Sequence, residues 1–392
     1  MKFWGARVWR ILGPVLWLAL SALYLLLYLR VMLTPEQRSG SDFIAFYSAG
    51  RIAREQGFPL AYDIAAQRQI QAALVGFPLA EGQVLLYNHL PFLLPALALM
   101  ALPNYLAAFF LWQAALLTLM LGALQIFYRL PLALSAAEKW AALFFFPLFF
   151  SLLNGQDSAA VLLALAAWSF FLWRGRDFSA GLALSLLALR PQWAILFCLP
   201  FFFQRRGVLA GALTGAAGLA LLSFSLLGWR GAQDFLQILS ISAGGEWYGM
   251  KENAMFNLLG ILARAFPAAL PQARLMAWAV YAFFALALIF VWRSSGLSLA
   301  AKISWQILAA CFFSPHLHFH DLSVLVFPLL LLLPAWRNLL RGKIPAWACL
   351  LLLSFALMFS QALAWTKFFV PYLLMILLAV VLWRFGNDAG TL

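Results

Sequence analysis

The sequence predicts an all-α polytopic membrane protein, and three observations support this prediction. Of the 392 residues, 65% are hydrophobic and 10% are charged, whereas an average soluble domain is about half apolar and about a quarter charged. Apolar runs of roughly 17–25 residues, the length of a bilayer-spanning helix, recur along the whole chain. Because the hydrocarbon core offers no water to backbone groups, each span must satisfy its own hydrogen bonds, which favours a helix bundle. We therefore expect a single integral membrane domain over residues 1–392, with about twelve spans.

The first apolar run, Ile11–Leu29, follows the basic residues Lys2, Arg7 and Arg10. It is too long for the core of a signal peptide, and no small-residue cleavage site follows it. We expect an uncleaved membrane anchor whose N-terminal end is cytoplasmic.

The segment 31–88 is predicted to be the first external loop. It holds four arginines and five acidic residues, and near neutrality is typical of loops that are translocated across a membrane. Within it, Phe43–Gln56 and Ile64–Leu74 have the composition of short amphipathic helices that lie at the membrane interface.

Two later regions contain apolar runs that are short for a span. Leu90–Leu102 and Tyr105–Tyr128 are separated by the dipeptide PN, and Phe178–Leu189 and Pro191–Phe203 meet at the tripeptide RPQ. If the number of membrane crossings is even, one of these segments does not cross the membrane. We therefore expect one re-entrant segment. A second external loop is expected over residues 230–253.

The formal net charge of +13 raises the question of a nucleic-acid partner, but the positions of the charges argue against one. The basic residues gather in short turns, as the positive-inside rule expects of cytoplasmic loops, where they also meet anionic lipid headgroups. They are Arg174, Arg176, Arg205, Arg206, Arg293, Lys302, Arg337, Arg341, Lys343 and Arg384. Three cysteines lie in apolar runs without metal-ligand spacing, so Cys198, Cys311 and Cys349 are expected to be packing residues.

The polar residues that could carry chemistry lie in the predicted external turns, and all four histidines are among them. The set comprises Asp42, Asn88, His89, Asn154, Gln156, Asp157, Arg190, Glu246, His316, His318, His320 and Asp321. Ionisable groups at membrane depth are costly, so they are functional candidates when they face a shared cavity. We expect these turns to converge on one polar site that faces outward.

Asp42 has two interpretations. An aspartate directly before an apolar stretch is an ordinary helix N-cap, here for the helix that starts near Phe43. Alternatively, a carboxylate at the membrane surface can act as a general base that takes a proton from an acceptor hydroxyl.

Arg190 has two interpretations as well. It can be an interfacial residue whose charged end reaches the lipid headgroups. However, Pro191 follows at once and interrupts the helix, which leaves a guanidinium at a helix end deep in apolar sequence. Its paired donors match phosphate oxygens, so we favour phosphate binding.

The pentapeptide HLHFH, residues 316–320, allows three roles: metal binding, capping where two helices meet, or hydrogen bonds to a ligand. Alternating histidines without a second ligand cluster are weak support for a metal. In NGQD, residues 154–157, the Asn-Gly pair is explained by turn chemistry, whereas Gln156 and Asp157 are not and are candidate substrate contacts.

Trp247 and Tyr248 lie in the second predicted external loop. They can belong to the aromatic belt at the membrane interface. The glycines on both sides favour instead a lid or a surface on which a sugar ring stacks.

A succession of motifs resembles glycosyltransferase family 87, the polyprenyl-phosphate-mannose-dependent mannosyltransferases of the GT-C fold. The motifs are an Asp-Phe pair after the first span, then YSAGRIAREQGFPLAYD, LYNHLPFLLPALALMALP, NGQDSAAVLLALA, AGLALSLLALRPQWAILFCLPFFFQRR and SPHLHFHDLSVLVFPLLLLL. The resemblance covers residues 40–336 in consistent order. Tyr47, which opens the first long motif, is counted among the candidate substrate contacts.

The resemblance implies that a hexose, with mannose as the default, passes from a polyprenyl-phosphate donor to an acceptor hydroxyl on a lipid, glycan or protein. It implies a site on the extracytoplasmic face of a bacterial inner membrane. The family's acidic residue at the start of the first external loop falls on Asp42, in the role of general base. The family's donor-phosphate turn, usually Lys-Pro, is Arg190-Pro191 here, and His316, His318 and His320 join it as candidate phosphate contacts.

This chemistry is expected to need neither metal nor other cofactor. A departing phosphate monoester is a weak base, so the enzyme must supply a base for the acceptor and donors for the developing phosphate charge. Glycosidases use a second carboxylate because their leaving alkoxide must be protonated. The sequence has no Asp-x-Asp motif to hold a metal for a nucleotide diphosphate, and in-line attack would invert the anomeric centre.

Two other classes share the predicted topology. A lipid or sugar transporter would carry broken helices in two related halves, and we find no internal duplication. A ligase or polymerase of polyprenyl-linked polysaccharides would have its large external segment late in the chain, whereas here it follows the first span.

Overall fold

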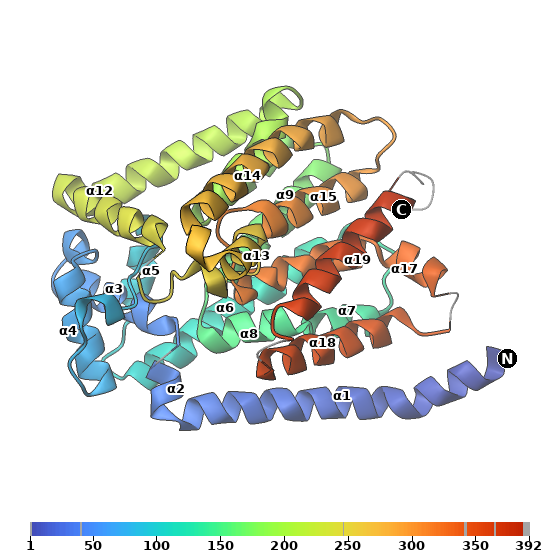
Figure 1. Ribbon diagram of the computed structural model, residues 1–392, viewed down its shortest axis with the longest axis horizontal. Coiled ribbons are helices and arrows are strands. Elements are labelled where there is room, and N and C mark those ends of the chain that lie inside the picture. The colour runs from blue at the N-terminus through green and yellow to red at the C-terminus, as the bar shows by residue number, and fades with distance from the viewer. Residues whose placement is uncertain (1, 40, 246, 341–342, 364–365, 387–392) are drawn as a thin grey trace.

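The protein is an integral membrane protein built of helices (Figure 1). The computed structural model describes residues 2–39, 41–245, 247–340, 343–363 and 366–386. It is 80% helical, and no strand occurs in the described residues.

In chain order the α-helices are α1 (Lys2–Leu33), α2 (Pro35–Ser39), α3 (Phe43–Glu55), α4 (Ile64–Val75), α5 (Leu94–Met100), α6 (Tyr105–Phe127), α7 (Ala136–Leu143), α8 (Phe146–Asn154), α9 (Ser158–Trp173), α10 (Asp177–Leu184), α11 (Pro191–Cys198), α12 (Arg206–Gly244), α13 (Leu258–Ala265), α14 (Leu270–Arg293), α15 (Leu299–Phe313), α16 (Val326–Leu331), α17 (Leu333–Leu339), α18 (Ala346–Ala362) and α19 (Phe369–Phe385). The 3₁₀ helices are η1 (Phe58–Leu60), η2 (Glu81–Gln83), η3 (Pro91–Leu93), η4 (Ser185–Leu189), η5 (Leu199–Phe202), η6 (Glu252–Ala254), η7 (Pro267–Ala269) and η8 (Phe319–Leu325).

Five helical segments of the described chain are long and apolar enough to cross a membrane alone. They are Val8–Leu33, Tyr105–Phe127, Ala136–Asn154, Arg206–Gly244 and Pro267–Arg293. The pair Phe319–Leu331 and Leu333–Leu339, bent by 64°, adds a sixth if it forms one broken span. Seven further apolar helices of the described chain have 10–17 residues.

Helix α1 lies along the outside of the bundle (Figure 1). It packs against α18 and α8, and the hydroxyl of Tyr24 donates to the carbonyl of Phe144 at 2.7 Å. Several of its leucines are exposed, among them Leu18 at 74% and Leu26 at 63%. An apolar helix that is bare on one side is suited to lipid, which agrees with the predicted anchor.

Both short helices predicted in the first external loop are present as α3 and α4. Asp63 caps α4 by accepting a hydrogen bond from the backbone N–H of Ala66 at 2.8 Å. Most residues of helix α3 are buried against neighbouring helices. It packs so closely on α5 that a Cβ at Gly50 would lie 2.6 Å from the carbonyl oxygen of Leu97.

The external loop predicted over residues 230–253 is shorter than expected. Helix α12 continues through Gly244, passing a kink at Gly228, where φ is 63°. The reason is visible in the sequence, since Phe235, Ile238 and Ile241 recur at helical spacing and pack against the core. The helix ends where Gly245 adopts a left-handed conformation.

Helices α10 and α12 approach each other through glycines. A Cβ at Gly181 would overlap the carbonyl oxygen of Val208, and a Cβ at Gly211 would overlap that of Phe178. Small residues allow this closeness between membrane helices. The contact fixes α10 and η4, which lead directly to Arg190.

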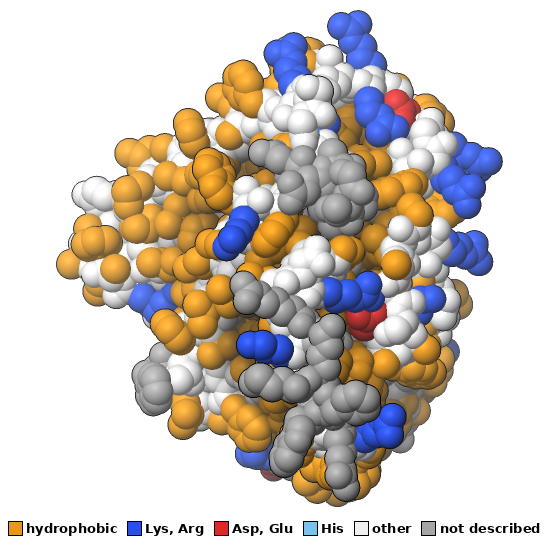
Figure 2. Space-filling model, turned by 90° about the vertical axis from the view of Figure 1, so that its right-hand side faces the viewer, with side chains coloured by type: hydrophobic (Ala, Val, Ile, Leu, Met, Phe, Trp, Pro, Cys, Tyr) orange, Lys and Arg blue, Asp and Glu red, His pale blue; other side chains and the backbone are white. Residues whose placement is uncertain are grey.

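One end of the molecule carries many basic side chains. Figure 2 shows Lys and Arg side chains scattered over the end that carries the N-terminus in Figure 1. Helix α1 reaches this end beside the basic turn after α17, where Trp9 donates to the carbonyl of Lys343 at 3.1 Å. The opposite end carries α3 and α4 (Figure 1).

Candidate active site

The described residues form a cavity of about 690 Å³, and the predicted external turns converge on it. Its walls come from the start of α3, the segment before η3, the α8–α9 turn, the η4–α11 turn and the segment between α15 and η8. Ten of the residues singled out from the sequence line it: Asp42, Asn88, His89, Asn154, Gln156, Arg190, His316, His318, His320 and Asp321.

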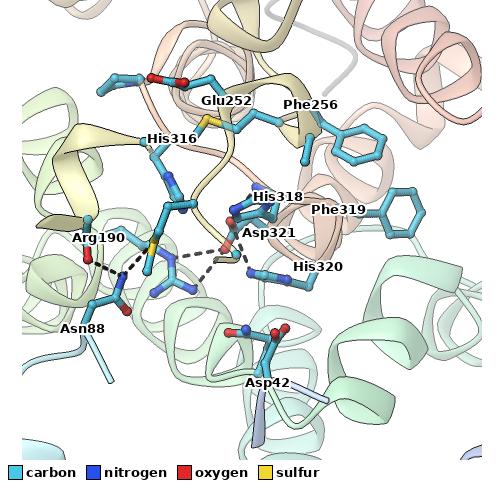
Figure 3. Close-up of a pocket in the computed structure, with 18 of the residues that line it drawn as sticks. Asp42, Asn88, Arg190, Glu252, Phe256, His316, His318, Phe319, His320 and Asp321 are labelled. Atoms are coloured by element: carbon cyan, nitrogen blue, oxygen red, sulfur yellow. Dashed lines mark hydrogen bonds and ion pairs between the residues drawn. The ribbon is translucent and has the colours of Figure 1, made fainter. Parts of the chain in front are cut away.

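Asp42 lies at the start of α3 without capping it. Its backbone is already in the helical region, and its side chain makes no capping hydrogen bond. Instead, the carboxylate faces the cavity, where it lies below His320 in Figure 3. Its negative charge also acts on His318. The capping interpretation of Asp42 is wrong for this structure.

Arg190 is held between two carboxylates. Its Nη2 lies 2.9 Å from Asp157 Oδ1, its Nε donates to Asp321 Oδ1 at 3.2 Å, and its Nη1 donates to the carbonyl of Leu189 at 3.0 Å. Only 7% of the residue is exposed, so the headgroup-reaching interpretation is wrong. Burial works against the charge, but Asp157 and Asp321 raise the pKa of Arg190 above its ordinary value.

The two carboxylates are themselves fixed by histidine residues. His89 Nδ1 lies 2.9 Å from Asp157 Oδ2, and the backbone N–H of His318 donates to Asp321 Oδ2 at 3.0 Å. Asp157 is buried behind the cavity wall and does not line the cavity. Each acid therefore holds the arginine and is positioned in turn by another element.

His316, His318 and His320 form a row of rings along the cavity (Figure 3). Neighbouring ring centroids are 4.6 Å and 5.7 Å apart. Burial, aided by the neighbouring histidine in each case, lowers the pKa of His316 to about 3 and that of His318 to about 4. Both imidazoles are therefore neutral at neutral pH, and each can donate a hydrogen bond without carrying charge.

One histidine of the row, His318, has the capping role that the sequence allowed. The side chain of His318 accepts from the backbone at the start of η8, while Asp321 accepts from the backbone of His318. Among the described residues, no group of three or more His, Cys, Asp or Glu side chains is arranged to hold a metal ion. The three cysteines are free thiols.

Three sequence-based candidates lie away from the cavity. Tyr47 is buried, and its hydroxyl donates to the carbonyl of Leu102 at 2.9 Å. Trp247 Nε1 donates to the carbonyl of Val84 at 2.7 Å, which ties its loop to the first external segment. Tyr248 is 52% exposed and does not line the cavity. Glu246, also a candidate, lies outside the described residues.

Several cavity residues were not anticipated from the sequence. They are Gln192, Ser242, Glu252, Arg274, Gln361 and Lys367. Glu252 Oε1 lies 2.5 Å from Arg274 Nε, which joins the loop after α12 to α14. The signal was present for Arg274, since it is an ionisable residue inside an apolar run.

The fold and the cavity together define an integral membrane protein with an enzyme-like polar site enclosed by its helices. The sequence model of glycosyltransferase family 87 matches residues 87–315, which is more than half of the chain. The chain therefore belongs to glycosyltransferase family 87 and is a membrane glycosyltransferase. The matched residues include His89, Asp157 and Arg190, whereas Asp42 and the histidine row lie outside them. No curated protein and no solved structure matches the chain significantly.

Proposed function

We propose that this glycosyltransferase moves a hexose, with mannose as the favoured sugar, from a polyprenyl-phosphate donor to an acceptor hydroxyl and inverts the anomeric centre. One observation carries the proposal: Asp42, Arg190 and the histidine row line the same cavity. A carboxylate thus faces hydrogen-bond donors across a space of about 690 Å³, which is a volume typical of a ligand site.

Asp42 acts as the general base. The acceptor oxygen attacks the anomeric carbon while its proton passes to the Asp42 carboxylate. The bond from that carbon to the phosphate oxygen breaks, and its electron pair leaves with the lipid phosphate. The freedom of Asp42 from a capping bond supports this role.

Arg190 and the three histidines of the row contact the donor phosphate. Two of these histidines, His316 and His318, are neutral and can donate hydrogen bonds to its oxygens. Because a phosphate monoester leaves without protonation, no second acid and no metal is needed in this scheme. The sugar hydroxyls are bound by Asn88, His89, Asn154 and Gln156, with Asp157 and Asp321 holding Arg190 in place.

The apolar part of the cavity supports a lipid-linked donor. Ile195 on α11, Leu239 on α12 and Trp278 on α14 all line it. Ile195 is 56% exposed and Trp278 is 50% exposed, and α14 belongs to a segment long enough to span the membrane. A prenyl chain can therefore leave the polar site between these helices and remain in contact with hydrocarbon.

The charge distribution supports an extracytoplasmic site. With the basic end (Figure 2) in the cytoplasm, as the positive-inside rule favours, α3 and α4 at the opposite end, and with them the cavity wall at Asp42, are extracytoplasmic. We propose a GT-C bundle of about twelve spans in a bacterial inner membrane, acting on a lipid, glycan or protein acceptor.

The test replaces Asp42 by asparagine. Because a carboxamide cannot accept the hydroxyl proton, Asp42→Asn should lower kcat by roughly 10²–10⁴-fold. Transfer of radiolabelled sugar from a panel of polyprenyl-phosphate hexoses measures this, and unchanged thermal unfolding in detergent shows that the variant is folded.

Asp63→Asn is the matched control. Asp63 lies in the same external segment, caps α4 and does not line the cavity. It should lose about 1 kcal/mol of stability at most and keep its turnover. Full turnover by Asp42→Asn would remove the proposed base, and movement of the donor across vesicles without sugar transfer would make the protein a carrier.

A further inference from the structure

The cations that line the cavity are not equally available to a ligand. Arg190 faces two carboxylates, those of Asp157 and Asp321. Arg274 pairs with Glu252 at 2.5 Å and also donates to the carbonyl of Gly244 at 2.7 Å. Both guanidinium charges are therefore already offset by the protein itself.

Lys367 differs from these two arginines among the described residues that line the cavity, because no carboxylate offsets its charge. No carboxylate of the described chain lies within 4.0 Å of its ammonium group, and its side chain is partly exposed. Its Nζ lies 5.6 Å from the centroid of the Phe368 ring. A lysine in this state presents a positive charge and three donors to whatever occupies the cavity.

The turn that carries Lys367 is held in place from both sides. Gln361 Nε2 donates to the carbonyl of Lys367 at 3.1 Å. The ring of Phe368 packs against Phe256 at 4.7 Å between centroids and lies 3.7 Å from the guanidinium carbon of Arg264. The lysine therefore projects from a fixed turn directly before α19.

The proposed reaction needs such a charge. The donor is a phosphodiester with one negative charge, and its product is a phosphate monoester that carries up to two near neutral pH. The charge of Arg190 is already offset, and a neutral imidazole adds none. Resting on the function proposed above, we propose that Lys367 binds the donor phosphate and stabilises the additional negative charge that develops as the sugar leaves. It transfers no proton in this step.

The experiment measures binding of decaprenyl monophosphate, independently of any sugar transfer. Purified wild type, Lys367→Gln, Lys367→Arg and the control Lys251→Ala are titrated in nanodiscs, with decaprenol as the uncharged ligand. Lys251 is an exposed lysine of the loop after α12 that does not line the cavity.

Loss of one charged hydrogen bond should weaken monophosphate binding by Lys367→Gln roughly tenfold or more. Lys367→Arg and Lys251→Ala should bind like wild type, and decaprenol should bind all four alike. Equal monophosphate binding by Lys367→Gln and wild type would overturn the assignment of Lys367 and leave the proposed donor intact. If wild type itself does not distinguish the monophosphate from decaprenol, the lipid-phosphate donor and the role of Lys367 fall together.

Discussion

Arg190 shows how much a single side chain depends on residues that are distant in the sequence. The sequence predicted that the guanidinium of Arg190 binds a phosphate. In the structure this guanidinium forms ion pairs with Asp157 and Asp321. These acids lie 33 and 131 positions away. No local pattern tells which acid meets which base, so this pairing was beyond sequence-based prediction.

The pairing leads to a stability prediction. Arg190→Ala removes the cationic partner of two buried carboxylates, which should cost about 3–5 kcal/mol, in addition to its effect on donor binding. Chemical unfolding in detergent measures the loss.

The matched control is Arg51→Ala, which breaks a surface pair with Glu55 in which both side chains are at least a third exposed. An exposed pair contributes only about 0–1 kcal/mol. Equal losses in the two variants would contradict the buried cluster described here.

At the level of helices, two breaks marked by proline were predicted from the sequence, whereas the end of α12, marked by glycine, was not. Pro191 starts α11 as expected, because proline suits the first helical position. The breaks between Leu90–Leu102 and the next run, and after Leu189, were placed within a few residues of the observed ends. Glycine was less informative, since Gly228 kinks a helix that continues to Gly244.

The glycines of α12 provide an element-scale test. A methyl group at Gly211 would overlap the backbone of Phe178 on α10, and the two helices would have to separate. Gly211→Ala should therefore lose about 1–3 kcal/mol and lower sugar transfer, because α10 leads to the turn of Arg190.

Gly218→Ala in the same helix is the control. A methyl group at that position meets nothing within 4 Å, and alanine is the better helix former. Its melting temperature should equal or slightly exceed that of wild type. A Gly211→Ala variant that melts like Gly218→Ala would refute the close glycine contact.

At the level of the whole molecule, composition predicted the membrane class because a soluble protein of this length cannot bury so many apolar residues in its core. It could not determine the number of spans. A helix such as Pro91–Met100 rises only about 15 Å, half of the hydrocarbon thickness, so crossings depend on how short helices stack. That arrangement is a tertiary property.

Orientation can be tested with two exposed positions in a variant that lacks the native cysteines. Ala80 follows α4, and Gly296 lies in the basic turn between α14 and α15. In intact cells, a membrane-impermeant maleimide should label Ala80→Cys and spare Gly296→Cys until the membrane is opened. The reverse pattern would put the cavity on the cytoplasmic side.

The wall of the cavity formed by Ile195 and Trp278 has a kinetic consequence. Both side chains are about half exposed, and both line the cavity. A donor that arrives there travels sideways within a leaflet, so its effective concentration is a mole fraction of the bilayer. Adding inert phospholipid at a constant total amount of donor should then slow turnover by surface dilution alone.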